Sequence, residues 1–174
     1  NSGEVGIDCG GTCAPCELKN PKPLSVFWAR LAGAGGDLYD AVALVENQNQ
    51  VLASGDVRYE FSLFDDLGLV ARKTGTAFVY PQERLYIVEP ALRTSRKPVR
   101  IEFRVTAVVW RTSHESPPII IVEHRDYAII TVGQKKQSTV TADLFNESPL
   151  GFRAFEVTAA VFDAAGNLIG ANKV

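Results

Sequence analysis

Polar and apolar residues alternate along several stretches of this chain. In residues 56–64, one set of side chains falls on one face of an extended segment: Val57, Tyr59, Phe61 and Leu63. The intervening set is polar: Arg58, Glu60 and Ser62. A period of two predicts a half-buried β-strand, and antiparallel sheets with one solvated face produce this pattern. No long segment shows a helical apolar stripe, so the sequence predicts an all-β fold.

The chain also repeats itself, because residues 43–70 resemble residues 142–169. Each copy begins with an alternating stretch that ends at Asn47 or Asn146, which we interpret as strand-end turn residues. Val140, Ala142 and Leu144 take the places of Ala41, Ala43 and Val45. In the second stretch, one set takes the places of the residues expected to be buried in the first copy: Phe155, Val157, Ala159 and Val161. Self-similarity at this spacing indicates tandem domains.

Each copy closes with the pattern Phe-Asp-x-x-Gly. Asp65 and Asp163 are expected to accept backbone hydrogen bonds at the start of a type I turn. Gly68 and Gly166 are expected to take the positive φ that closes a hairpin with a bulge.

These signals predict two tandem immunoglobulin-like antiparallel β-sandwiches behind a short disulfide-stapled loop segment. The predicted bounds are 1–23 for the Cys-rich leader and linker, 24–105 for the first sandwich and 106–174 for the second. Trp28 and Trp110 are interpreted as equivalent first-strand residues that pack in the core or between domains, rather than as ligand platforms.

The second sandwich is expected to be incomplete at its C-terminus. Residues 69–105 finish the first domain after Gly68, whereas residues 167–174 are all that follow Gly166. By the usual strand length of ~5–6 residues, roughly two strands are lacking. They are truncated, disordered or supplied by another chain through strand addition, which makes a homo-oligomer or filament one expected form of protein partnership.

Composition narrows the possible partners. A net charge of −2 without a basic block gives no case for nucleic acid or an anionic membrane surface. No apolar run approaches the roughly 20 residues of a transmembrane helix. Methionine is absent and the chain opens on Asn1, so we expect a processed or partial chain whose targeting segment lies upstream.

Three cysteines cluster near the start, at Cys9, Cys13 and Cys16. Ahead of a Cys-free body, such a cluster is typical of a disulfide staple in an exported protein, and the odd count leaves one thiol whose partner is open. The spacing is formally that of the iron–sulfur site of radical enzymes, but those enzymes place it on an α/β barrel, and no barrel is predicted here. A zinc site would need a fourth ligand, and both histidines, His114 and His124, lie in the predicted second domain.

No catalytic set emerges from the sequence. The run His124 to Tyr127 mimics a kinase tripeptide, but the expected Asn is Thr131, so we interpret it as a polar bend between strands. Nucleophile-elbow, zinc-protease and phosphate-loop patterns are absent, and Asn146-Glu147-Ser148 is a formal glycosylation sequon. We therefore predict a protein that is not an enzyme and has no cofactor.

Phe61, Leu63, Phe64 and Asp65 resemble the Phe-x-Leu-Tyr-Asp strand end of the FxLYD type of bacterial immunoglobulin-like domain, with Phe64 replacing its Tyr. The resemblance covers most of residues 39–93 and 137–170. The leader resembles an Asp-Cys-Gly-Gly-x-Cys-x-x-Cys segment found near the start of some exported or lipid-anchored bacterial proteins. Both resemblances imply a cell-surface, extracellular or periplasmic β-sandwich protein, and neither implies catalytic residues.

The leading functional hypothesis is a non-enzymatic structural protein that serves as a spacer, an adhesive module or a filament subunit. The alternative is a carbohydrate-binding module that uses loops at the sandwich ends, for which Tyr80, Tyr86 and Tyr127 are the candidate aromatic residues. A third hypothesis is a redox or metal role for the cysteine leader.

Overall fold

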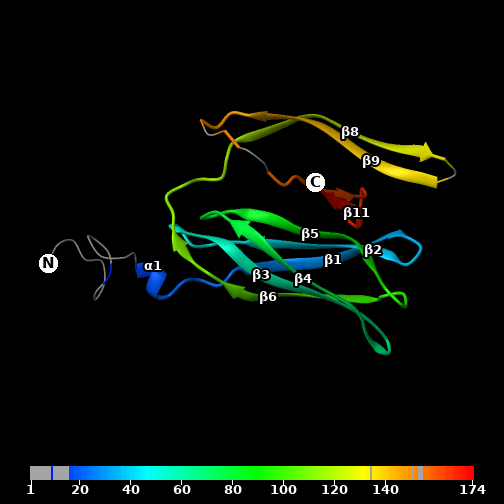
Figure 1. The fold of residues 1–174 in the computed structure, drawn as a ribbon, viewed down its shortest axis with the longest axis horizontal. Coiled ribbons are helices and arrows are strands. Elements are labelled where there is room, and N and C mark those ends of the chain that lie inside the picture. The colour runs from blue at the N-terminus through cyan, green and yellow to red at the C-terminus, as the bar shows by residue number, and fades with distance from the viewer. Residues whose placement is uncertain (1–8, 10–15, 134, 150, 153–154) are drawn as a thin grey trace. The chain divides into compact units, whose positions relative to one another are not determined.

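The computed structural model describes Cys9 and residues 16–133, 135–149, 151–152 and 155–174. In these residues the secondary structure is one short helix and eleven strands, so the predicted all-β class is confirmed (Figure 1). The elements are α1 (Cys16–Lys19), β1 (Ser25–Gly35), β2 (Leu38–Glu46), β3 (Leu52–Asp65), β4 (Gly68–Val79), β5 (Arg84–Arg93), β6 (Arg100–Val108), β7 (Arg111–Thr112), β8 (Ile120–Val132), β9 (Lys135–Asn146), β10 (Thr158–Phe162) and β11 (Leu168–Lys173). The helix lies in the segment that we predicted to be a loop.

The chain divides into two compact units. Unit 1 comprises Asn1–Ser116 together with Glu156–Val174, and unit 2 comprises Pro117–Phe155. Within unit 1, one antiparallel sheet has the order β1-β2-β5 and another has the order β4-β3-β6, with β7 paired to the start of β3 (Figure 1). The two sheets face each other as in a β-sandwich.

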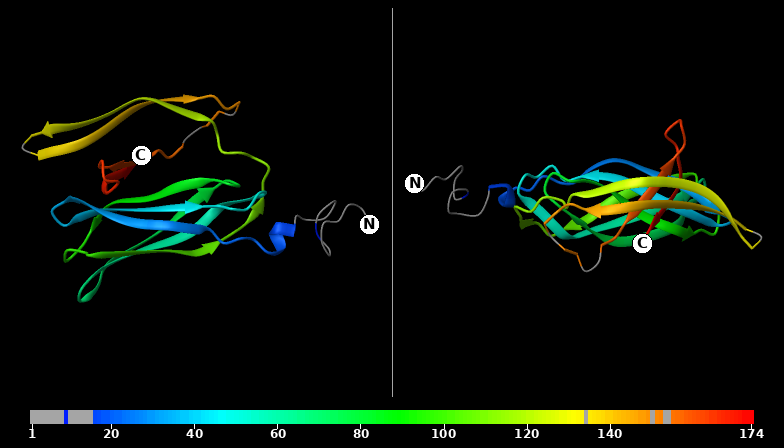
Figure 2. Two further views of the ribbon diagram at one scale, coloured as in Figure 1. Left: turned by 180° about the vertical axis from the view of Figure 1, so that it is seen from behind. Right: turned by 90° about the horizontal axis from the view of Figure 1, so that it is seen from above.

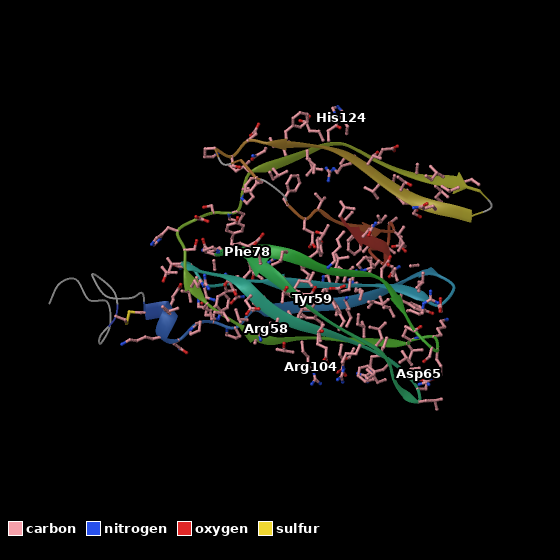
Figure 3. The ribbon with its side chains drawn as sticks, viewed as in Figure 1. Arg58, Tyr59, Asp65, Phe78, Arg104 and His124 are labelled. Carbon is pink, nitrogen blue, oxygen red and sulfur yellow. A yellow bond between two sulfur atoms is a disulfide. The ribbon has the colours of Figure 1, made fainter. Side chains whose placement is uncertain are left out.

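The core of unit 1 lies between these sheets. It is built from alternate residues of β2, β3 and β5: Ala41, Ala43, Val45, Tyr59, Phe61, Leu63 and Ile87. The predicted inward face of β3 is therefore confirmed, and Figure 3 shows Tyr59 between the sheets with Arg58 and Arg104 pointing outward. Ser62 is an exception, because it is buried on the polar face, where it lies between Arg72 and Glu102 on the neighbouring strands and its hydroxyl is 3.0 Å from Glu60 Oε1.

The C-terminal hairpin β10–β11 packs on the outer side of the β1-β2-β5 sheet, a place that the sequence did not predict (Figure 2). Leu168 is buried against Ala32, Val42 and Val88, and Phe162 meets the Trp28 ring edge-on at 6.0 Å. A third layer thus covers part of this sheet.

The predicted orientation of β10 requires correction. The expected buried set was Phe155, Val157, Ala159 and Val161, but Ala160 and Phe162 make the contact with the sheet, and Phe155 is 59% exposed. Because β10 is nearly all apolar, its period does not decide which face is buried, and the fit of Phe162 and Leu168 to the sheet decides it instead.

The predicted domain boundary also differs from the structure. Strand β6 continues from Arg100 to Val108, across the expected boundary at 105/106. Trp110 packs against Leu24, Val57 and Val79 in unit 1, whereas Trp28 lies on the outer side of β1, so the two are not equivalent. Residues 106–174 are divided between the two units rather than forming one sandwich.

Unit 2 is built around the antiparallel hairpin β8–β9. Its register is regular except between Glu123 and Asp126, where β8 bulges and His124 takes a φ of 46°. The segment that we expected to be a bend between strands is thus a bulge within one strand.

Candidate functional site

The four turn residues singled out by the repeat occupy matching positions in hairpins β3–β4 and β10–β11. Asp65 Oδ1 accepts a hydrogen bond from the Leu67 N–H, and Asp163 Oδ1 accepts one from the Ala165 N–H, both at 2.9 Å. Gly68 and Gly166 have φ values of 131° and 80°. Each hairpin also has a register shift one residue before its Asp, so the duplicated sequence produces duplicated turns.

Both turn carboxylates are held in their charged form. A side-chain hydrogen bond from Arg96 lowers the pKa of Asp65, and hydrogen bonds from Asn167 lower the pKa of Asp163. These contacts explain the two aspartates as structural residues of the turns.

Two asparagines that end matching strands also form similar turns. Asn47 Oδ1 accepts a hydrogen bond from the Asn49 N–H, and Asn146 Oδ1 accepts one from the Ser148 N–H, both at 3.0 Å. In unit 1 the network extends further, because Asn47 Nδ2 also donates to the carbonyl oxygens of Leu52 and Tyr80. The interpretation of both asparagines as strand-end turn residues is confirmed.

The cysteine leader is attached to unit 1 near this turn. The Sγ atoms of Cys9 and Cys16 lie at disulfide-bonding distance, while Cys13 lies outside the described residues. One residue beyond Cys16, the Glu17 carboxylate accepts hydrogen bonds from the Gln50 and Val51 N–H groups. Glu17 therefore fixes helix α1 to the loop that precedes β3.

Two buried carboxylates hold the C-terminal hairpin to the rest of unit 1. Asp40 accepts a hydrogen bond from the Ala91 N–H through Oδ1 and one from the Ala171 N–H through Oδ2, both at 2.9 Å. Glu89 Oε1 lies 3.4 Å from Lys173 Nζ. Asp40 thus connects a bulge in β5 to strand β11.

Glu89 is also part of the sandwich core. Its Oε1 accepts a hydrogen bond from the Tyr59 hydroxyl at 2.7 Å, and its Oε2 lies 3.8 Å from Lys73 Nζ. Burial, together with this carboxylate, raises the pKa of Tyr59 well above the ordinary range of a tyrosine. The hydroxyl therefore stays protonated and serves as a hydrogen-bond donor.

One face of the β8–β9 hairpin is apolar, and we call it the β8–β9 apolar face. It consists of Ile120, Val122, Tyr127 and Ile129 from β8, with Val140, Ala142 and Leu144 from β9. Tyr127 lies opposite Val140, and Val122 lies opposite Leu144. Five large side chains of this face are between 37% and 62% exposed: Val122, Tyr127, Ile129, Val140 and Leu144.

The other face of β8–β9 is mixed, because it carries the carboxylates of the hairpin together with apolar residues such as Ile121, which lies opposite Phe145. Glu123 lies opposite Asp143, Asp126 opposite Thr141 and Ile130 opposite Gln137. At the bulge, His124 Nδ1 lies 2.8 Å from Asp143 Oδ2 (His124 is labelled in Figure 3). The two faces therefore differ in charge, since Glu123, Asp126 and Asp143 lie on the second face, although that face also exposes Ile130, Val132 and Phe145.

Unit 1 contains a groove at one end of the sandwich, with a volume of about 570 Å³. It is lined by residues of β3, by Phe78 of β4 and by the segment from Val109 to Glu115. Phe78 is 49% exposed. Sequence analysis missed this residue, although the run Ala77-Phe78-Val79-Tyr80 signals it, since in a strand the neighbours of buried Val79 must face outward.

The three candidate tyrosines lie in different surroundings. Tyr80 is half-buried and its ring centroid lies 4.5 Å from that of Phe78. Tyr86 is on β5 beside Trp28, at 5.8 Å, and Tyr127 is on the β8–β9 apolar face with its hydroxyl 3.1 Å from Ser138 Oγ. Of the three, Tyr80 is the one that adjoins the groove.

In the described part of the chain, no three His, Cys, Asp or Glu side chains gather closely enough to hold a metal ion. Among the same residues, no helix has the length and apolar character needed to cross a membrane. Comparison with known proteins finds no match to this chain among family models, curated proteins or solved structures.

Proposed function

We propose that this protein is a non-enzymatic, extracytoplasmic structural protein that assembles with further copies of itself through the β8–β9 apolar face. Its unit 1 is an immunoglobulin-like sandwich, the sequence repeat derives from duplication of such a module, and the Cys9–Cys16 pair is a disulfide that staples the leader. The observation that supports assembly is the exposure of five large apolar side chains on one side of a two-stranded hairpin.

Such a hairpin needs a covering layer. An isolated pair of strands is marginally stable in water, and contiguous apolar surface on a soluble domain marks an interaction site. The positions of this face that pair with Ile120 and Ile129 are Asn146 and Ser138, which are polar but uncharged, so the part of the face from Ile120 to Ile129 brings no like charges together when two copies bury it.

Duplication of an immunoglobulin-like module is supported by the matching turns at Asp65 and Asp163 and at Asn47 and Asn146. Extracytoplasmic location is supported by the paired cysteines, because disulfides persist in oxidising compartments. Unit 1 then provides a stable folded body, and the β8–β9 apolar face provides contact between chains.

Adjacent isoleucines of β8 offer a matched test. Ile129 is 62% exposed on the β8–β9 apolar face, and Ile130 is 43% exposed on the opposite face. Burial of one such side chain stabilises association by about 1.5–3 kcal/mol, so Ile129→Asp should weaken self-association by roughly 10- to 100-fold. Ile130→Asp introduces the same charge into the same strand and should leave association close to that of the wild type.

Sedimentation velocity over a concentration series of the full chain measures this difference. The expected result is concentration-dependent association of the wild type that Ile129→Asp removes and Ile130→Asp retains. A wild type that stays monomeric at its highest soluble concentration, or equal loss in both variants, would overturn the proposed assembly role.

A further inference from the structure

The groove beside Phe78 begins where β3 departs from its neighbours. On one side the pairing with β4 jumps from Ser54 to Val57, and on the other side β7 pairs with Leu52 and Ala53 before β6 takes over at Val57. Gly55 lies in this irregular stretch. Because Gly55 has no side chain, it leaves the space of the groove unfilled at this position.

The Phe78 ring is held in place on two sides. A Cβ at Gly55 would lie 3.6 Å from Phe78 Cδ2, so the ring lies against this glycine, and the Tyr80 ring meets it at an interplanar angle of 66°. The ring still exposes about half of its surface. It is thus an aromatic platform whose orientation is fixed before any ligand arrives, which lowers the entropy cost of binding.

Polar groups surround this ring. Thr112 and Ser113 line the groove with hydroxyl groups, and Arg111 and Glu115 contribute charged side chains. Asp56 lies on the β3 side, where it is paired with Arg58 at 2.9 Å. Glu115 also lies close enough to Tyr80 to contribute, after burial, to raising the pKa of that tyrosine.

The groove carries no excess of positive charge, because its lining holds two carboxylates, Asp56 and Glu115, and one guanidinium group, Arg111, while Arg58 pairs with Asp56 from outside the lining. A site for phosphate or for an acidic polymer would concentrate positive charge. A balanced set of donors and acceptors around an apolar ring suits a neutral ligand that is rich in hydroxyl groups.

We propose that this groove binds a neutral saccharide, with the C–H face of one sugar ring stacked on Phe78 and its hydroxyl groups bonded to the polar rim. A sugar ring matches the groove because it presents an apolar face and a polar edge together, as an aromatic platform with polar neighbours requires. The inference is independent of assembly through the β8–β9 apolar face.

Phe27 provides a matched control for Phe78. Both rings are 49% exposed, but Phe27 lies on β1 with Arg84 4.5 Å from its centroid and is not part of the groove. Phe78→Ala should weaken saccharide binding at least ~10-fold, as expected for truncation of a central anchor. Phe78→Trp keeps an aromatic face and should retain binding, and Phe27→Ala should bind like the wild type.

The probes are soluble oligosaccharides of glucose, mannose and N-acetylglucosamine, added to the full ¹⁵N-labelled chain and followed by NMR. The expected result is that at least one probe shifts the amide signals of Gly55, Phe78 and Thr112, and that Phe78→Ala abolishes these shifts. The proposal is overturned if no probe shifts any groove amide, if the shifts lie elsewhere, or if Phe27→Ala and Phe78→Ala lose binding equally.

Discussion

Replacement of Asp40 by Asn tests how strongly the Asp40 carboxylate fastens the C-terminal hairpin to the rest of unit 1. Asp40 is 7% exposed, and its two oxygens accept hydrogen bonds from the N–H groups of Ala91 and Ala171. An asparagine of the same shape keeps one acceptor oxygen, but its NH₂ group must then face one of these two N–H donors. One bond is therefore lost and one buried donor is left without an acceptor.

The expected magnitude follows from the charge and the burial of this group. A hydrogen bond to a charged partner contributes about 1.5–3 kcal/mol, and an unsatisfied buried donor costs about 1–3 kcal/mol. Both figures describe the same lost hydrogen bond and are not added, so we expect Asp40→Asn to lower the free energy of unfolding by about 2–3 kcal/mol. Asp37→Asn is the control, because Asp37 pairs with Arg93 at the surface and such exposed pairs contribute less than ~1 kcal/mol.

Urea denaturation gives the change in the free energy of unfolding, and amide hydrogen exchange locates it. In Asp40→Asn, the Ala171 and Ala91 amides should exchange faster relative to the Ala43 amide in the core, whereas Asp37→Asn should leave all three unchanged. A loss of less than about 0.5 kcal/mol, or unchanged protection of both amides, would refute the role of Asp40 as the fastening group.

Two further substitutions test the buried polar groups of unit 1. A Cβ at Gly75 would lie 2.5 Å from Tyr59 Cζ and 2.9 Å from Glu89 Oε1, so Gly75→Ala should lower the free energy of unfolding by about 1–3 kcal/mol. Gly33→Ala is the control and should cost far less, because no atom lies within 4 Å of a Cβ at Gly33. Thermal denaturation compares the two variants. Burial raises the pKa of Glu83, which means that its charged form is disfavoured in the folded state and that stability is lost as the pH rises through the folded pKa. Glu83→Gln keeps an acceptor for the Tyr80 N–H and should therefore be more stable than the wild type in urea at pH 7, with a difference that disappears below the ordinary glutamate pKa of about 4.3; a difference independent of pH would contradict this cause.

The sequence predicted those features of the fold that depend on neighbouring residues. Alternation placed Tyr59 and Phe61 inside because a strand turns successive side chains to opposite faces. The Asp-x-x-Gly turns form because Asp65 and Gly68 lie within one four-residue turn, so the chemistry that produces them is local.

The features that it did not predict depend on residues far apart in the chain. Asp40 and Ala171 are separated by 131 positions, and Ala91, whose N–H donates to the other oxygen of Asp40, is 51 positions away. The packing of Phe162 against Trp28 likewise has no local signal, since both sides of β10 are apolar. Phe78 was overlooked because its outward position reveals a groove only when Gly55 and Thr112 lie beside it.

A period of two identifies which side chains share a face, but it does not identify what covers that face. Ala41, Ala43 and Val45 are fully buried, whereas Val140 and Leu144, at the corresponding positions of the repeat, are 44% and 37% exposed. The difference between these sets lies in the partner, because β2 faces Phe61 and Leu63 across the core of unit 1. Val140, Ala142 and Leu144 keep the apolar pattern of a buried strand, yet they are exposed. Such exposed apolar surface favours association, which is the physical reason for the proposed role in assembly.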